Sequence, residues 1–438
     1  MGRRRSGRGA RGLAMGGMAA ALGTAGCAPP ASGAGQPPGQ GPAQAPPVPP
    51  SPATPRDAAP RASAPRVAPA AARALADTLR AVLDRAVGDG AFPGAYAAVG
   101  TADGVLAEYG AGRLDRAGDA ARPDARTLWD LASLTKVVAT TSAVLQLVGD
   151  GRVALDSPVT RYLPEWQVPG GTAVTVRRLL THSSGMPAWR PLYKEATSAE
   201  GALALALATR PDAAPGVRYV YSDLNAILLG RLVARVSGAP FEAYLTRHVF
   251  APLGMSDTRF NPPAAERARI APTEYDPWRQ RQLRGEVHDE NAFALGGVSG
   301  HAGLFSTGAD LARFARAYLS GGTLDGTRVF DAATLARFAQ VQDTALSRRA
   351  LGWETPTGGN SAGHYLSRSA IGHTGFTGTS LWMDRERGLF VLLLTNRVNP
   401  TRMNTRIGGV RTALADAAMQ ALGFSPAFPL PVPAPSSR

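Results

Sequence analysis

Ser133 and Lys136 lie three residues apart in the stretch DLASLTKVVATTSAVLQLV, which covers residues 130 to 148. Lys136 is one of only two lysines in a chain that carries 45 arginines. An arginine stays charged under ordinary conditions, whereas a buried lysine can lose its proton and act as a base. No proline or glycine interrupts the run before Gly149, so we expect a helix that presents both side chains on one face. Such a lysine can activate the serine hydroxyl as a nucleophile.

Two further short stretches carry residue types that suit acyl chemistry. In YVYSDLNAILLG, Tyr221 and Asp223 are expected in a loop ahead of an apolar helix that begins near Leu224. An adjacent ammonium would stabilise a tyrosine phenolate and lower the pKa of the hydroxyl from about 10. In GHTGFTGTSLWM, the residues His373, Thr374 and Gly375 precede a strand predicted from Ser380 to Met383, where a glycine lets a substrate backbone approach.

The elements that must position these motifs follow from apolar periodicity. Helices are predicted over residues 71–87 and 407–422, and a hairpin over residues 95–112 turns at 102–104. A second hairpin over residues 379–396 turns at 384–388. The alanine- and leucine-rich middle is expected to be mostly helical. The predicted fold class is therefore α+β: one antiparallel sheet built from both ends of the chain, flanked by helices, with a helical insertion subdomain.

The first 70 residues have the composition of a targeting segment and a tether. An arginine-rich head and a short apolar run precede Cys27, the only cysteine, in LGTAGC, which is similar to a bacterial lipobox. Residues 28–70 contain 14 prolines and no aromatic residue, which is typical of an extended linker. We therefore expect a signal segment at 1–27, a tether at 28–70, the folded domain at 71–425 and a flexible tail at 426–438.

The charge of the chain does not indicate nucleic-acid binding. Of the formal charge of +14, +7 belongs to residues 1–70, and no basic stripe interleaved with aromatic residues follows them. The stretch HDEN (His288–Asn291) holds metal-ligand residue types, but no second histidine has ligand spacing, so no metal site is predicted. His182 and His301 are expected to anchor loops. No cofactor motif is present.

The three motifs, in this order, resemble the serine β-lactamase and penicillin-recognising D,D-peptidase superfamily, and within it the class C-like group. The stretches LLTHSSGMP, GGVSGHAGLFSTGADLARF and LLLTNRVNPT are also similar to that group. The resemblance implies that Ser133 is the acylated nucleophile, Lys136 its proton acceptor or electrostatic partner, and Tyr221 a general acid or base. It further implies an oxyanion hole made by the N–H groups of Ser133 and Phe376.

Two positions depart from the pattern of that group. Asp223 stands where asparagine is usual, and an ionised carboxylate cannot donate a hydrogen bond to a substrate amide unless Asn225 or a protonated Asp223 does so. His373 replaces the lysine of a Lys-Thr-Gly triad, so its charge would weaken above about pH 6.5. Some D,D-carboxypeptidases of the group share that histidine, which favours a peptidase over a dedicated β-lactamase.

The sequence therefore predicts an exported serine acyl-enzyme hydrolase. Its expected activity is that of a penicillin-binding D,D-carboxypeptidase acting on cell-wall peptides such as those of peptidoglycan. The alternatives are an esterase or amidase of small acyl substrates, then a β-lactamase, and, outside enzymes, a β-lactam or cell-wall sensor that is acylated once. Export and the lipobox-like cysteine predict a lipid anchor on a bacterial membrane, facing the periplasm or the cell exterior.

Overall fold

The computed structural model describes residues 67–116 and 118–430 of the chain. All described residues belong to the unit Asp57–Arg438. Cys27, the predicted signal segment and most of the predicted tether therefore lie outside the described residues.

The central sheet joins the two ends of the folded domain. Its strands β1 (Gly94–Thr101), β2 (Val105–Gly112), β10 (Ile371–Thr374), β11 (Ser380–Asp384) and β12 (Leu389–Thr395) lie in the order β10-β11-β12-β1-β2. All neighbouring strands are antiparallel. The two hairpins meet where β1 pairs with β12, with Ala95 opposite Thr395. The predicted α+β fold and its sheet made from both chain ends are confirmed.

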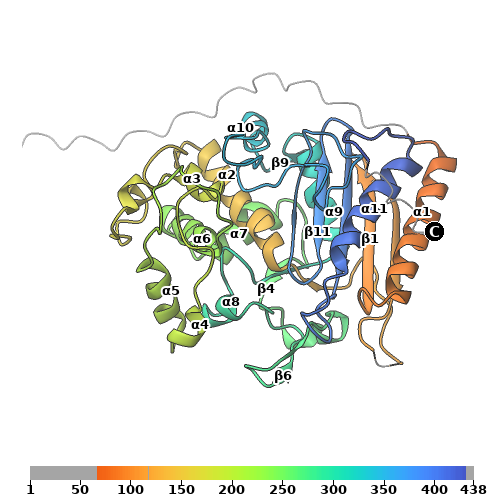
Figure 1. The fold of residues 1–438 in the computed structure, drawn as a ribbon, viewed down its shortest axis with the longest axis horizontal. Coiled ribbons are helices and arrows are strands. Elements are labelled where there is room, and N and C mark those ends of the chain that lie inside the picture. The colour runs from red at the N-terminus through yellow and green to blue at the C-terminus, as the bar shows by residue number, and fades with distance from the viewer. Residues whose placement is uncertain (1–66, 117, 431–438) are drawn as a thin grey trace, which may run out of the picture. The chain divides into compact units, whose positions relative to one another are not determined.

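Helices cover both faces of this sheet because β1 alternates its side chains between two apolar layers. Val99 packs with helices α1 (Pro69–Gly88) and α11 (Ile407–Ala421), which lie side by side on the outer face (Figure 1). The ring of Tyr96 points to the opposite layer, where helix α9 (Gly308–Leu319) crosses the sheet. The predicted terminal helices therefore form, within two residues of the expected bounds.

The long middle of the chain forms the helical region seen to the left of the sheet in Figure 1. Its helices are α2 (Ser142–Gly149), α3 (Val176–Leu180), α4 (Leu192–Glu195), α5 (Ala199–Leu207), α6 (Asp223–Ser237), α7 (Phe241–Leu245), α8 (Glu290–Ala294) and α10 (Ala332–Phe338). Short strands also occur: β3 (Trp129–Asp130), β4 (Arg259–Phe260) and β7 (Leu304–Ser306) form one sheet, and the pairs β5 (Tyr275–Asp276) with β6 (Arg281–Gln282) and β8 (Thr323–Leu324) with β9 (Thr327–Arg328) form two ribbons.

The predicted helix of the first motif forms as one apolar helical run, Ala132–Gly149. It has the length and apolarity of a membrane span, but 78% of it is buried within the protein, so it is the central core helix. The run begins with a 3₁₀ turn (Ala132–Leu134), widens to a π-helical turn (Lys136–Thr141) and ends as α2. The Thr141 hydroxyl donates to the carbonyl of Lys136 at 2.8 Å, five residues back, which fits the wider turn. Such π turns often mark functional sites.

Two local features differ from the sequence expectations. His373 and Thr374 lie on a strand of their own, β10, which turns back into β11, rather than only preceding a strand. The segment 426–430, expected to belong to a flexible tail, is packed: Phe428 is 7% exposed, and the Arg368 guanidinium lies 4.5 Å from its ring centroid. The Phe428 N–H also donates to the carbonyl of His364, because a buried backbone group needs a partner.

This packing predicts that Phe428 contributes to stability. We expect Phe428→Ala to lower the free energy of unfolding by about 2–4 kcal/mol, because a buried aromatic side chain is removed. Leu430→Ala is the matched control, since Leu430 is 50% exposed, and should change it by less than about 0.5 kcal/mol. Urea unfolding measures both; equal values for the two variants would show that the segment does not pack in solution.

Candidate active site

A strained turn places Ser133 at the head of the central helix. Ala132, immediately before it, has φ of +46°, a left-handed conformation that non-glycine residues rarely adopt. The buried Asp130 carboxylate holds this turn, because it accepts the N–H of Ala132 at 2.8 Å and that of His288 at 2.6 Å. Backbone strain of this kind is found where surrounding structure imposes it, often at functional sites.

The turn between β10 and β11 locks onto the segment just before Ser133. The Thr377 hydroxyl donates to the carbonyl of Asp130 at 2.7 Å, and the Thr379 hydroxyl to that of Leu131 at 3.0 Å. A Cβ atom at Gly375 would lie 2.1 Å from the Thr379 hydroxyl and 2.3 Å from the Leu131 carbonyl. Glycine is therefore required here by the protein's own packing. The sheet and the helical region meet at this contact.

Lys136 lies at the centre of the site, as the first motif predicts. Its Nζ atom is 2.9 Å from Ser133 Oγ, 2.8 Å from Asp223 Oδ1 and 3.0 Å from the carbonyl oxygen of His301. Burial by itself lowers the pKa of Lys136, but the charges and hydrogen bonds of Asp223 and Tyr221 raise it above its usual value. The expectation that burial alone deprotonates this lysine is therefore wrong: in the resting site its partners hold the pKa of Lys136 above its usual value, so it is an ammonium.

Tyr221 packs against Lys136 and two histidine rings. Its ring centroid lies 5.0 Å from Lys136 Nζ, 4.6 Å from that of His182 and 5.8 Å from that of His373. Burial raises the pKa of Tyr221, and the nearby ammonium offsets only part of that rise. The expected phenolate does not form, so Tyr221 is a neutral phenol that can donate a proton.

His373 is buried and neutral. Burial lowers its pKa well below 6.5, and the positive charges of Arg349 and Lys136 act in the same direction. Its Nδ1–H donates to the carbonyl of Thr374 at 2.8 Å, and Nε2 has no hydrogen-bond partner among the described residues. The sequence prediction of a switchable cation near pH 6.5 is therefore wrong: desolvation keeps this imidazole uncharged at neutral pH.

A cleft of about 350 Å³ opens over these groups. It is lined by Ser133, Tyr219, Tyr221, Arg349, Glu354, His373, Thr374, Gly375, Phe376, Arg397 and Arg411. Among the described residues, neither the Ser133 N–H nor the Phe376 N–H donates to a protein group. Both are thus available as donors to an oxyanion. Asp223 does not line the cleft.

Three arginines of the cleft were not found from the sequence. Arg397 and Arg411 hold the β10–β11 turn through its carbonyl groups, including that of Phe376 at 2.7 Å and that of Gly375 at 2.6 Å. Arg349 is only 6% exposed, and its Nε and Nη2 atoms have no partner among the described residues. In a chain with 45 arginines no spacing singles these out. Only the tertiary structure, which places all three in the lining of the cleft, distinguishes them from the other arginines.

Asn225 does not replace the missing side-chain amide at position 223 as a donor to a substrate amide. Asn225 is fully buried, and its side chain binds Ser184 Oγ at 2.6 Å and His182 Nδ1 at 3.3 Å. It therefore cannot serve a substrate amide. His182 also accepts the Ser222 N–H at 3.1 Å, and Ser222 caps α6 through the Asn225 N–H. The predicted loop-anchoring role of His182 is confirmed.

The stretch HDEN contributes to a polar cluster beneath Lys136. His301 Nε2 lies 2.8 Å from Asp289 Oδ1 and its Nδ1 lies 2.7 Å from Ser299 Oγ, so His301 anchors its loop as expected. Ligand atoms of Asp223, Asp289 and His301 lie within 4.8 Å of one another. The lysine ammonium and Ser299 already bond to this cluster, which leaves it a charge-paired network rather than a set of free ligands.

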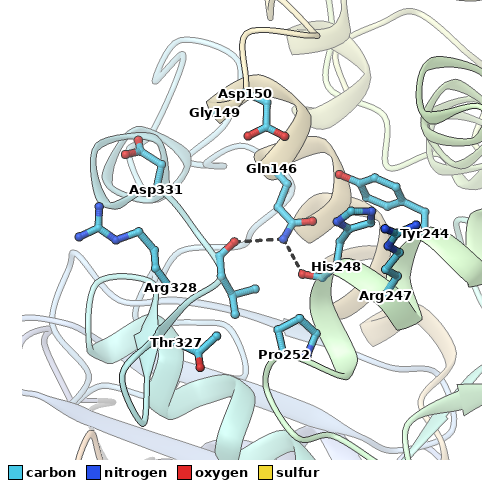
Figure 2. A pocket seen from close by; sticks show the side chains of 11 residues that line it. Gln146, Gly149, Asp150, Tyr244, Arg247, His248, Pro252, Thr327, Arg328 and Asp331 are labelled. Carbon is cyan, nitrogen blue, oxygen red and sulfur yellow. Dashed lines mark hydrogen bonds between the residues drawn. The ribbon is translucent and has the colours of Figure 1, made fainter. Parts of the chain in front are cut away.

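A second cavity, of about 360 Å³, lies near the opposite end of the central helix. Figure 2 shows Gln146 donating to the carbonyls of His248 at 2.7 Å and Val329 at 3.0 Å in its wall. Gln146 and Ser133 are 13 residues apart, roughly 20 Å along a helix. None of the predicted site residues lines this cavity, so the cleft over Ser133 is the candidate active site.

The family model described as Beta-lactamase matches residues 75–415. The chain belongs to the Beta-lactamase family. It is 33% identical over 308 residues to an Escherichia coli K12 protein named "Putative D-alanyl-D-alanine carboxypeptidase", over 62% of this chain and 69% of the relative. A Salmonella agona relative with the same name is 31% identical over 318 residues, 64% and 72% of the two chains. The predicted superfamily is confirmed, and the chain is a serine hydrolase related to penicillin-binding proteins.

Solved structures of the family share the fold. A penicillin-binding protein homologue from Caulobacter crescentus superposes with a TM-score of 0.65 at 22% identity, over 81% of this chain and 98% of its own. The hydrolase EstCE1, described as having promiscuous acyltransferase activity, gives 0.65 at 20% identity, over 80% and 99%. Likeness at these identities shows the fold alone.

The buried neutral histidine predicts a pH dependence of stability. Because the folded pKa of His373 lies below its unfolded value, the unfolded chain binds the extra proton and stability is lost as pH falls below about 6.5. We expect His373→Gln to remove about 1.4 kcal/mol per pH unit from that slope. Urea unfolding of both proteins between pH 7.5 and 5 measures it. Parallel profiles would contradict a buried neutral His373.

Proposed function

We propose that the protein is a D,D-carboxypeptidase that is acylated at Ser133 and removes a C-terminal residue from cell-wall peptides. The observation that carries this is Arg349, a buried guanidinium in the cleft that Ser133 also lines. Its Nη1 atom lies 3.5 Å from Glu354 Oε1, while its Nε and Nη2 atoms have no hydrogen-bond partner among the described residues. A planar guanidinium suits the carboxylate of a peptide C-terminus. The names of the relatives support the same substrate class.

The geometry supports the following steps. Ser133 Oγ attacks the penultimate carbonyl carbon, and the oxyanion that forms accepts hydrogen bonds from the N–H groups of Ser133 and Phe376. The Lys136 ammonium, 2.9 Å from Oγ, stabilises the negative charge that develops on the serine. The proton that Ser133 loses is taken up by the Lys136–Asp223 pair, and Tyr221, a neutral phenol, gives its proton to the leaving amine as the C–N bond breaks. Water then attacks the ester carbonyl and gives one proton to the Tyr221 phenolate. The proton held by the Lys136–Asp223 pair returns to Ser133 Oγ as the peptide acid leaves.

Esterase activity is the second candidate, and Asp223 favours it. The position offers no amide donor, and Asn225 is buried and bonded elsewhere. An ester without a neighbouring amide would not require that donor. A β-lactamase, or a sensor that is acylated once, would use the same Ser133 and differs only in how fast water attacks the acyl-enzyme.

Mass spectrometry after incubation with a fluorescent penicillin tests the nucleophile. We expect label on Ser133 and none on Ser133→Ala. Lys136→Arg should also lose acylation, because a longer planar guanidinium cannot keep the three contacts of the ammonium. Full acylation of Ser133→Ala would remove the proposed nucleophile. Label that persists, without release of product, would identify a sensor.

D-Alanyl peptides test the carboxylate assignment. We expect Arg349→Gln to raise KM for a peptide ending in D-alanyl-D-alanine by about 10–100-fold, which corresponds to the loss of one charged hydrogen-bonded pair of about 1.5–3 kcal/mol. The same peptide with a C-terminal carboxamide is the control and should be a poor substrate for both proteins. If the two peptides are cleaved equally by the unaltered protein, Arg349 does not recognise the carboxylate.

We also propose that Cys27, which lies outside the described residues, carries a lipid that holds the exported protein to a membrane. The proposal is supported by the lipobox-like LGTAGC and by the lack of any other cysteine in the chain. We expect Cys27→Ser to move the protein from the membrane fraction to the soluble fraction in a bacterial host. Recovery of the variant in the membrane fraction would contradict a lipid on Cys27.

A further inference from the structure

Asp223 is turned toward Lys136 instead of the substrate cleft. It is the first residue of α6, where Ser222 caps the helix and the Asp223 N–H donates to the carbonyl of Ala188 at 2.9 Å. Its Oδ1 lies 2.8 Å from Lys136 Nζ, and its side chain is 20% exposed. Helix α6 therefore fixes a carboxylate against Lys136, and Asp223 is not among the residues that line the cleft.

The three contacts of Lys136 leave it unable to take a proton directly. An ammonium has three N–H donors and no lone pair, and the three acceptors at 2.8–3.0 Å are Asp223 Oδ1, Ser133 Oγ and the carbonyl of His301. The Ser133 proton can reach Nζ only after Lys136 has given one away. Of these acceptors, Ser133 is itself the donor to be deprotonated and the peptide carbonyl is not basic. Tyr221 also bonds Lys136, but its pKa is raised and it is a neutral phenol, so it is not a base either. The carboxylate of Asp223 is the one basic partner of Lys136 among these groups.

We propose that Asp223 is the terminal proton acceptor for acylation, in a relay from Ser133 through Lys136. An Nζ–H bond of Lys136 breaks as an O–H bond forms on Asp223. The freed lone pair on Nζ takes the Ser133 proton as Oγ bonds to the substrate carbonyl carbon and the carbonyl π electrons move to its oxygen. Protons and charge balance, and no other reactant is needed. The proposal rests on Ser133 being the nucleophile.

The groups around Asp223 are compatible with a proton arriving there. Lys136, Tyr221, Asp289 and His301 are the titratable groups that face it. Asp289 is held ionised: burial opposes its charge, but His301, the Ala292 N–H and the lysine ammonium outweigh burial and lower its pKa. Asp223 pairs with Lys136 and Asp289 with His301, and ligand atoms of the two carboxylates lie within 4.8 Å of each other, so a proton on Asp223 would relieve their mutual repulsion.

Asp223→Asn separates this relay from a role in substrate binding. The amide has the size of the carboxylate and its oxygen can still accept from Lys136, but it cannot take a proton. We expect the rate of Ser133 acylation by a p-nitrophenyl ester to fall about 100-fold or more, with KM changed by no more than a few-fold. If the position serves only substrate amides, the asparagine usual in the family should leave this rate unchanged, which would overturn the proposal.

Stopped-flow release of p-nitrophenol measures that rate. Asp150→Asn is the matched control: Asp150 lies at the far end of the central helix, beside the cavity of Figure 2, and is exposed. It should acylate at the rate of the unaltered protein. An equal loss in both variants would overturn the relay. Because the donor is an ester, the result does not depend on whether D-alanyl peptides are the natural substrate.

Chemical rescue by an added carboxylate distinguishes proton transfer from a purely structural role of Asp223, because only lost proton transfer would be restored. Since the Asp223 side chain is partly exposed, a small carboxylate can enter the space left by Asp223→Gly. We expect formate and acetate to restore acylation, with acetate more effective per occupied site because it is the stronger base. Folding of each variant is checked by thermal unfolding. Absence of rescue in a folded Asp223→Gly protein that binds acetate would contradict the relay.

Discussion

The buried ammonium of Lys136 is the interaction on which the rest of the site depends. A charge removed from water must be paired and hydrogen-bonded or it destabilises the fold by several kcal/mol. Its partners come from three separate segments: the head of the central helix, the start of α6, and the loop before β7, whose His301 is 165 residues away. Satisfying one nitrogen atom therefore requires these segments to close together, and that closure sets the position of Ser133.

The sheet completes the site from the other side. The β10–β11 turn binds the carbonyls of Asp130 and Leu131, so hydrogen bonds hold the strand edge against the turn that carries Ser133. Desolvation keeps His373 neutral, and permanent positive charge in the cleft comes from arginines, of which Arg349 keeps unpaired donors. The arginines thus carry the positive charge of the cleft, while the neutral His373 offers only a hydrogen-bonding imidazole.

Helices and strands were predicted correctly from the sequence where their local residue patterns were long. The hairpin β1–β2 was found because two strand-like runs of eight residues each flank a short turn, and helix α11 because its helical pattern extends over 15 residues. Strand β10 was missed because it has only four residues, and Gly372 and His373 within it show no strand pattern. The π turn at Lys136 and the packing of Phe428 depend on contacts with distant residues, which no local window contains.

The sequence by itself determined which chemical groups the site would hold and in what order, because Ser133, Lys136 and Tyr221 belong to short motifs whose types and spacing are local properties. The tertiary structure alone decided their protonation. Whether Lys136, Tyr221 and His373 carry charge depends on burial and on neighbours such as Asp223 and Arg349. Desolvation and Coulomb energy depend on distance in space, which the order of residues along a chain does not state.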